Sequence, residues 1–156
     1  MTSPSRGSGQ AEGTDDPMGV LVGLAIEKTR TISESDIVGF AELTGDFAPH
    51  HVDEAFAARS PYGRRIAHGV LLLGYASAVS SDLGTQTPQQ VVSLGYDRIR
   101  FIKPVFLGDT ITIRYQVTDF DPVKRRTSAR VEIKNQDGQL VAVATHLLQA
   151  VGDAPA

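Results

Sequence analysis

The sequence predicts an α+β domain in which an antiparallel sheet wraps around one long buried helix. Residues 66–83 lack proline and are apolar on nearly every side through Val79, a pattern typical of a helix that protein covers all round. The segment that follows, residues 91–151, has the pattern of four successive strands. A chain of 156 residues, 41% of them hydrophobic, is long enough to bury one core of this kind.

The two ends of the chain are predicted to lie outside this domain, which should span residues 20–151. Residues 1–19 hold no aromatic and no branched aliphatic side chain, and they contain four of the 15 glycines. Such a segment buries too little apolar surface to offset the entropy lost on ordering, so we expect a disordered leader. Residues 152–156 should form a short flexible tail.

Three elements are expected before the long helix. Residues 20–26 are apolar enough for a first strand. A helix should follow in which Ser33 caps the N-terminus, Asp36 lies in the first turn and Gly45 ends the last turn. Residues 53–58 suit a short second helix.

The strands after the long helix differ in character. Residues 91–102 change the phase of their apolar pattern near residues 96–99, which indicates a bulge. Residues 110–118 alternate apolar and polar side chains, as a strand with one buried face does. The pair Asp137-Gly138 is typical of a hairpin turn. Residues 140–151 are apolar on both faces at several steps, which favours a central strand.

Composition excludes several classes of function. The chain has 15 Lys and Arg against 18 Asp and Glu, a formal net charge of −3, with no basic surplus for nucleic acid or an anionic membrane. The absence of cysteine excludes disulfides, thiolate metal sites and a cysteine nucleophile. The longest mostly apolar run, residues 70–79, is far shorter than the ~20 residues of a membrane span. We therefore expect a soluble cytoplasmic protein.

The segment with the clearest chemical potential runs from Thr44 to Asp53 and holds Asp46 and His51. Pro49 disfavours a helix at the residue before it, so we expect a loop that must fold back for the two side chains to meet. A carboxylate and an imidazole that share one water can serve as general base and acid near neutral pH. The alternative is structural: Asp46 caps the next turn and the histidines lie at the surface.

Three segments carry more specific motifs: Thr44-Gly45-Asp46-Phe47-Ala48-Pro49-His50-His51, then Ala67-His68-Gly69, then residues 100–110. The first is similar to the Ser/Thr-Gly-Asp-x-Asn-Pro-x-His loop of the MaoC-like, (R)-specific enoyl-CoA hydratases. The second resembles the Ala-His-Gly that opens the central helix of that family, and the third its strand-and-turn segment. The resemblance covers about residues 20–150 and implies the hot-dog fold.

This resemblance implies an enzyme that adds water reversibly to a trans-2-enoyl thioester and gives the (R)-3-hydroxyacyl product. Asp46 and His51 match the pair that holds the water and moves its protons, and either could be the formal base. Gly69 matches the glycine whose N–H polarises the thioester carbonyl, since a free amide at a helix N-terminus is a preorganised donor. Ser77 matches a hydroxyl that lines the pocket, although a bond to a backbone carbonyl explains it almost as well. No cofactor is implied.

One residue departs from the family pattern. Ala48 stands where the family has an Asn that helps hold the loop and the pocket, so a polar anchor is missing. A slow enzyme, an altered substrate and a non-catalytic subunit that binds acyl thioesters therefore stay open. A hot-dog thioesterase is a separate alternative, although thioesterases lack this loop. The expected ligand is an acyl thioester of coenzyme A or of a carrier protein.

Other polar residues have weaker claims. His68, at the entry to the long helix, could contact ligand, cap the helix or pack. The pair Arg64-Arg65 could contact the phosphates of coenzyme A or of a carrier-protein arm, or lie in a solvated loop. His50 has no helical His-x-x-x-His spacing, so no metal site is expected. His146, within the last strand, is expected to be a sheet residue with its hydrogen bonds satisfied.

The predicted architecture has a consequence for assembly. A sheet that covers a helix on one face leaves an open edge and an apolar rim. Self-pairing about a two-fold axis is the usual remedy, so we expect a homodimer. The family resemblance implies a dimer as well.

Overall fold

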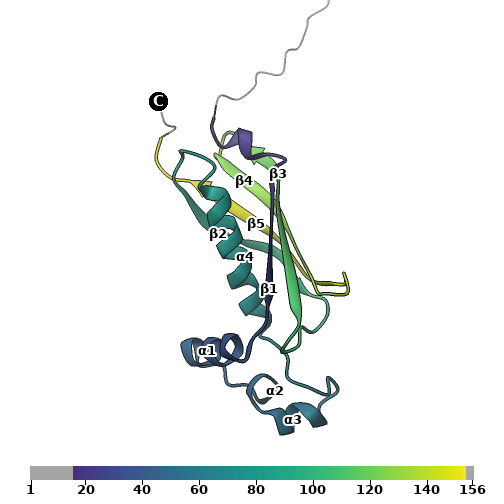
Figure 1. The fold of residues 1–156 in the computed structure, drawn as a ribbon. Helices are drawn as coiled ribbons and strands as arrows, with labels where there is room; N and C mark the ends of the chain where they lie inside the picture. Colours follow the sequence, from purple (N-terminus) through teal and green to yellow (C-terminus); the bar gives the residue numbers. More distant parts are fainter. Residues whose placement is uncertain (1–15, 154–156) are drawn as a thin grey trace, which may run out of the picture.

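The computed structural model describes residues 16–153, so residues 1–15 of the expected leader and 154–156 of the expected tail lie outside the described part. One turn of 3-10 helix comes first, and helices then precede most of the strands (Figure 1). The elements are η1 (Gly19–Leu21), β1 (Ala25–Thr31), α1 (Glu34–Thr44), α2 (Pro49–Val52), α3 (Glu54–Arg59), α4 (Gly69–Gly84), β2 (Val91–Phe101), β3 (Thr110–Asp121), β4 (Arg126–Lys134) and β5 (Leu140–Ala150).

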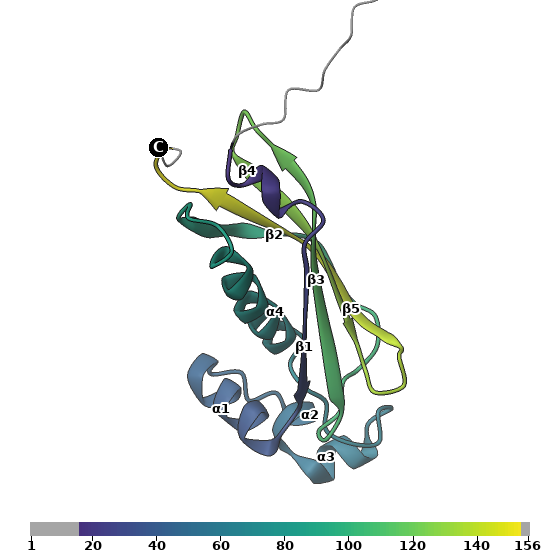
Figure 2. The ribbon, with the colours of Figure 1, turned by 45° about the horizontal axis from the view of Figure 1, so that its top comes forward.

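The five strands form one sheet in the order β1-β3-β4-β5-β2, and every neighbouring pair is antiparallel. Helix α4 lies along one face of this sheet, as Figures 1 and 2 show. The short helices α1, α2 and α3 gather at the end of the molecule where α4 begins. The predicted antiparallel sheet around a long helix is confirmed.

The core lies between α4 and the inner faces of β3, β4 and β5. The buried side chains of β3 follow the alternation that the sequence predicted: Ile111, Ile113, Tyr115 and Val117. Those of α4 that join the same core are Leu72, Ala76, Val79 and Leu83. Full burial of one large aliphatic side chain stabilises the fold by about 1.5–3 kcal/mol, so this layer holds the helix on the sheet.

The domain begins earlier than predicted. Met18, which we assigned to the leader, is fully buried, and Asp16 forms an ion pair with Arg125 at 2.7 Å. The strand expected at residues 20–26 is also misplaced, because most of that apolar stretch lies in and around the 3-10 turn. Strand β1 follows it and lies at one edge of the sheet, where its exposed polar and charged side chains disfavour pairing with other chains.

Helix α1 has the ends that the sequence predicted. The Ser33 hydroxyl accepts a hydrogen bond from the Asp36 N–H, and the Asp36 carboxylate accepts one from the Ser33 N–H. Gly45 follows the helix with φ of 80°, a left-handed conformation that suits glycine. The second predicted helix is α3, which Asp53 caps. Helix α2 was not expected, although Pro49 suits its first position, where no N–H is needed.

Helix α4 differs from the prediction at its start and in its burial. It begins at Gly69 rather than at residue 66, because Ile66 bridges to Phe106 and the Ala67 N–H donates to the Val105 carbonyl. Only the side toward the sheet is buried. The opposite side is exposed and made of small residues, Gly74, Ser77, Ala78 and Ser81 among them. The prediction that protein covers this helix on every side is therefore not met in the single chain, where the side away from the sheet is exposed.

Strand β2 forms the second edge of the sheet. Its pairing with β5 shifts register between Ser93 and Gly95 and again between Asp97 and Arg100, which confirms the predicted bulge. Arg98 has φ of 54° inside this irregular stretch. Several large apolar side chains at this edge are exposed: Val92, Leu94, Phe101 and Ile102.

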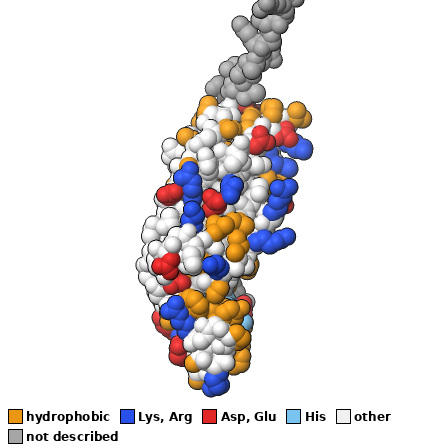
Figure 3. All heavy atoms as spheres, turned by 90° about the vertical axis from the view of Figure 1, so that its right-hand side faces the viewer, with side chains coloured by type: hydrophobic (Ala, Val, Ile, Leu, Met, Phe, Trp, Pro, Cys, Tyr) orange, Lys and Arg blue, Asp and Glu red, His pale blue; other side chains and the backbone are white. Residues whose placement is uncertain are grey.

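The surface in Figure 3 carries Lys and Arg interspersed with Asp and Glu, with apolar side chains between them. On this face the charges do not gather into a field of one sign. Among the helices of residues 16–153, none combines the length and the apolar character that a membrane crossing requires.

One polar group lies at the centre of the sheet. His146 is fully buried on β5, and both ring nitrogens are hydrogen-bonded at 2.7 Å, one to the Ser93 hydroxyl and one to the Tyr115 hydroxyl. The expectation of a satisfied sheet histidine is confirmed. Burial lowers the pKa of His146 to about 4, well below the ordinary value near 6.5.

This lowered pKa predicts a loss of stability in mild acid. Between pH 6.5 and about 4 the unfolded chain binds a proton at His146 that the folded chain does not, so falling pH favours unfolding. We expect this residue to remove about 2 kcal/mol of unfolding free energy between pH 7 and pH 5. Urea titrations at both pH values measure it, with His146→Gln as the comparison. An equal pH dependence in both proteins would contradict the prediction.

Candidate active site

The loop after α1 turns back on itself through short-range hydrogen bonds. The Thr44 hydroxyl donates to the Phe40 carbonyl at 2.7 Å and accepts from the Asp46 N–H at 3.3 Å. The Asp46 carboxylate accepts from the Ala48 N–H at 3.3 Å, as Asp does in tight turns. The Asp46 side chain is half exposed, so its carboxylate remains available to a ligand.

His51 lies on α2 and is buried, with 7% of its surface exposed. Its Nδ1 lies 2.7 Å from the Ile66 carbonyl oxygen, which can only accept, so Nδ1 carries the proton of the neutral ring. Burial lowers the pKa of His51, and the nearby His68 and His50 rings lower it further. The imidazole is therefore neutral at pH 7 and its Nε2 has a free lone pair.

His68, the residue before α4, is buried against the loop that holds Asp46. Its Nε2 donates to the Asp46 carbonyl oxygen at 3.0 Å, and its ring stacks on that of His51 with the centroids 3.8 Å apart. Only 2% of its surface is exposed. His68 thus packs against the two candidate catalytic residues and holds one of them.

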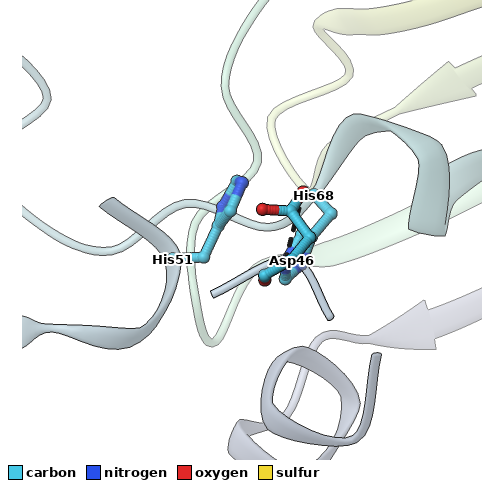
Figure 4. Close-up of side chains that lie close together, drawn as sticks. All are labelled: Asp46, His51 and His68. Atoms are coloured by element: carbon cyan, nitrogen blue, oxygen red, sulfur yellow. Dashed lines mark hydrogen bonds and ion pairs between the residues drawn. The ribbon is translucent and has the colours of Figure 1, made fainter. Parts of the chain in front are cut away.

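Figure 4 shows Asp46, His51 and His68 gathered from three separate segments. One donor atom of each lies within 4.8 Å of the other two, so the loop folds back as the sequence required. A cation could be held by such a set. However, one ring nitrogen of each histidine already donates a hydrogen bond to a backbone carbonyl. The atoms that remain accessible to a cation are therefore His51 Nε2 and the Asp46 carboxylate oxygens.

A cavity of about 350 Å³ opens beside this cluster. Its wall includes His51, Gly69, Phe101 and Lys103. Asp46 does not line it, but a carboxylate oxygen of Asp46 lies within 4.8 Å of a His51 ring nitrogen. The Gly69 N–H, the first of α4, has no acceptor among the described residues. A Cβ at Gly69 would lie 2.8 Å from the Phe101 ring, so glycine is what allows this close approach.

Two other predicted residues lie elsewhere. Ser77 lines a second cavity farther along α4, and its carbonyl accepts from the hydroxyls of Ser80 and Ser81. The Arg64 guanidinium stacks on Phe106, 4.0 Å from the ring centroid, and does not line the first cavity. The cation in that wall is instead Lys103.

Arg65 is a residue whose importance the sequence did not reveal. It is buried, its Nε donates to the His51 carbonyl at 2.6 Å, and its Nη1 donates to both carboxylate oxygens of Glu34. It therefore fastens α2 to α1 and cannot contact a phosphate. Arg65 and His68 each donate a hydrogen bond to a backbone carbonyl of this segment, at His51 and Asp46. In the sequence, Arg65 was notable only as the neighbour of Arg64, and no pattern around it indicated that its side chain is buried.

Comparison with known proteins agrees with this arrangement. The MaoC like domain family model matches residues 23–139. A 3-hydroxybutyryl-CoA dehydratase of Methylorubrum extorquens is 44% identical over 105 residues, which is 67% of this chain and 65% of that protein's length. An (R)-specific enoyl-CoA hydratase of Rhodospirillum rubrum is 40% identical over 69% of this chain and 73% of that protein.

Solved structures match a larger share of this chain. The unliganded R-hydratase PhaJ1 from Pseudomonas aeruginosa superposes with a TM-score of 0.72 at 32% identity, covering 90% of this chain and 94% of that one. The hot-dog fold expected from the sequence is thereby confirmed. The chain spans slightly less than two thirds of the length of the M. extorquens relative.

Proposed function

The chain belongs to the MaoC-like domain family, and from this membership we propose that it is a hydratase acting on trans-2-enoyl thioesters. The reaction adds water reversibly and gives the (R)-3-hydroxyacyl thioester. The observation that carries the proposal is a cavity whose wall holds a neutral imidazole and a helix N–H without an acceptor among the described residues, with a carboxylate oxygen of Asp46 within 4.8 Å of the imidazole. Relatives named as hydratase and dehydratase support it.

In this mechanism one water lies between Asp46 and His51. The free Nε2 of His51 takes a proton from the water as its oxygen bonds to C3 of the enoyl group, and the imidazolium returns that proton to C2. The Asp46 carboxylate accepts a hydrogen bond from the second hydrogen of the water and orients it. Water is thus added across the double bond with no proton left over, and the reverse sequence is dehydration.

Gly69 supplies the electrostatic part of the mechanism. As C3 is attacked, negative charge develops on the thioester carbonyl oxygen. The free N–H of Gly69, at the N-terminus of a 16-residue helix, is a fixed donor for that charge. Lys103 in the same wall suits the phosphates of a coenzyme A or carrier-protein arm better than Arg64 does.

A hydration assay tests the proposal. Purified protein should bleach the conjugated absorbance of crotonyl-coenzyme A, and chiral analysis should find the (R)-3-hydroxy product. Thiol release without hydration would indicate a thioesterase instead. Binding of both coenzyme A and carrier-protein thioesters without any turnover would replace the proposal by the non-catalytic subunit. The cytoplasmic location expected from the sequence stays a prediction.

We also propose that two copies pair through β2 and the open side of α4. Strand β2 has a free edge lined by exposed Val92 and Leu94, and α4 exposes a side of small residues that allows close packing. Pairing about a two-fold axis would continue the sheet from one chain into the next.

Sedimentation at micromolar concentration should therefore give a dimer. Leu94→Lys places a charge on an already exposed edge position, so it should raise the dimer dissociation constant at least about tenfold while the fold is kept. The same change on the other edge strand, Thr29→Lys, is the control and should leave the dimer intact. A stable monomer of the unmodified protein would contradict the pairing.

A further inference from the structure

The segment from Arg65 to His68 binds both candidate catalytic residues. The Arg65 Nε donates to the His51 carbonyl at 2.6 Å, and the Ile66 carbonyl accepts from the His51 ring at 2.7 Å. The His68 ring donates to the Asp46 carbonyl at 3.0 Å (Figure 4). Asp46 and His51 are therefore held by neighbouring positions of one short stretch of chain.

This segment is itself fixed to the chain that follows β2. The Ala67 N–H donates to the Val105 carbonyl at 2.7 Å, and the Leu107 N–H donates to the Arg65 carbonyl at 3.3 Å. Ala67 and Val105 are both buried. The backbone of the segment is thus held in place independently of α2 and of the Asp46 loop, and both can be positioned against it.

Arg65 also reaches helix α1. Its Nη1 lies 2.8 and 2.7 Å from the two carboxylate oxygens of Glu34, the first residue of that helix. Helix α1 ends at Thr44, and the loop that carries Asp46 follows it directly. The Glu34–Arg65 ion pair therefore connects the helix that leads to Asp46 with the backbone of His51.

The surroundings of Arg65 require a guanidinium rather than any cation. Only 7% of the side chain is exposed, and a charge so far from water needs hydrogen-bonding partners. A planar guanidinium directs Nε to the carbonyl while Nη1 meets the carboxylate. An ammonium group has one nitrogen and cannot occupy both positions. Since Nη2 already has no acceptor among the described residues, loss of a further partner would leave the buried charge poorly bonded.

Glu34 and Arg65 do not line the cavity beside His51, so neither contacts a molecule bound there. Resting on the proposed function, we propose that Arg65, held by Glu34, is a positioning residue that fixes His51 relative to Asp46 and the attacking water. Its bond to the His51 carbonyl fixes α2 at the distance that the ring needs to reach the segment.

This role determines which nitrogen of His51 carries the proton. The proton stays on Nδ1 because the Ile66 carbonyl accepts it. If α2 moves away from the segment, that bond is lost and the proton can occupy Nε2 instead. The lone pair that takes the proton of the water then disappears. A misplacement of ~1 Å can by itself cost on the order of 10²-fold in rate.

The kinetic test separates positioning from substrate binding. Arg65→Lys keeps the charge but should lower kcat for crotonyl-coenzyme A about 10- to 100-fold, with KM changed less than about threefold. Glu34→Gln should lower kcat in the same way, by about fivefold or more. Because both changes act through one bond, the double variant should lose little more than Arg65→Lys. Glu42→Gln removes an exposed carboxylate from the same helix and is the matched control, which should alter neither constant.

Nitrogen NMR of the His51 ring gives a second readout, which a general loss of stability would not move. The unmodified protein should show the Nδ1-protonated form at pH 7, and Arg65→Lys and Glu34→Gln should shift the signals towards the Nε2-protonated form. If Arg65→Lys fails to fold, Glu34→Gln decides by the same criteria.

Three results would overturn the inference while hydration by the unmodified protein stands: an unchanged kcat in both variants, a KM that rises as kcat falls, or a lower kcat with the His51 tautomer unchanged. If the unmodified protein hydrates no substrate, the proposed function fails and the NMR comparison alone decides the role of Arg65. A change of tautomer in the variants then supports it, and an unchanged tautomer refutes it.

Discussion

Asp46→Asn and His51→Gln are each expected to lower kcat about 10²–10⁴-fold, with the double variant only slightly worse than either single one. Asn keeps the size and the turn of Asp46 but carries no charge to orient the water, and Gln cannot take its proton. Because both act on one water, their losses should not add. The rate of crotonyl-coenzyme A hydration measures this. Full activity in either variant would remove that residue from the chemistry.

The pH profile separates chemistry from simple structural damage. Burial lowers the pKa of His51 below its usual 6.5, so the neutral, active ring persists into mild acid and the acid limb of kcat/KM should lie below pH 6.5. The limb should disappear from the residual activity of His51→Gln. His50→Gln is the comparison: it removes a neighbouring ring that lowers the pKa of His51, so the acid limb should remain and move to higher pH. An acid limb that persists in His51→Gln would assign it to another group.

Local patterns predicted the parts of the fold that depend on near neighbours in sequence. The Ser33–Asp36 cap, the Gly45 stop and the alternation from Ile111 to Val117 each involve residues a few positions apart. The start of the domain did not follow from such patterns. Met18 is buried and Asp16 reaches Arg125, more than 100 residues away, and leader-like composition carries no sign of either contact.

In the candidate site, too, the features that depend on near neighbours in sequence were predicted and those that depend on distant residues were not. The spacing of Asp46 and His51 indicated a folded-back loop, but what holds that loop comes from distant positions. Arg65 binds the His51 carbonyl and Glu34, and His68 binds the Asp46 carbonyl. The bonds to His51 and Asp46 join side chains to backbone atoms, which have no residue type for a sequence pattern to detect, and Glu34 lies 31 residues from Arg65. Nor could the exposed side of α4 be foreseen, because apolar and small residues look alike whether their own chain or a second copy covers them.

Gly69→Ala should lower kcat/KM about 10²-fold, although it adds a single methyl group. A Cβ at this position would lie 2.8 Å from Cδ2 and Cε2 of Phe101, closer than such atoms pack, so the ring or the helix end must shift. The Gly69 N–H would then point away from the carbonyl oxygen it serves. Loss of one such donor costs about 10²–10³ in rate, and small displacements are costly too.

Two further variants identify the cause of that loss. Gly39→Ala, on helix α1 and away from the proposed pairing surface, has no atom within 4 Å of the added Cβ and should leave activity unchanged. Gly69→Ala combined with Phe101→Ala removes the collision, because Phe101 is half exposed and its ring can be cut back. That double variant should recover most of the rate of Phe101→Ala alone if displacement of the amide is the cause. No recovery would instead mean that the methyl meets the thioester itself, and an active Gly69→Ala would show that catalysis does not depend on this amide.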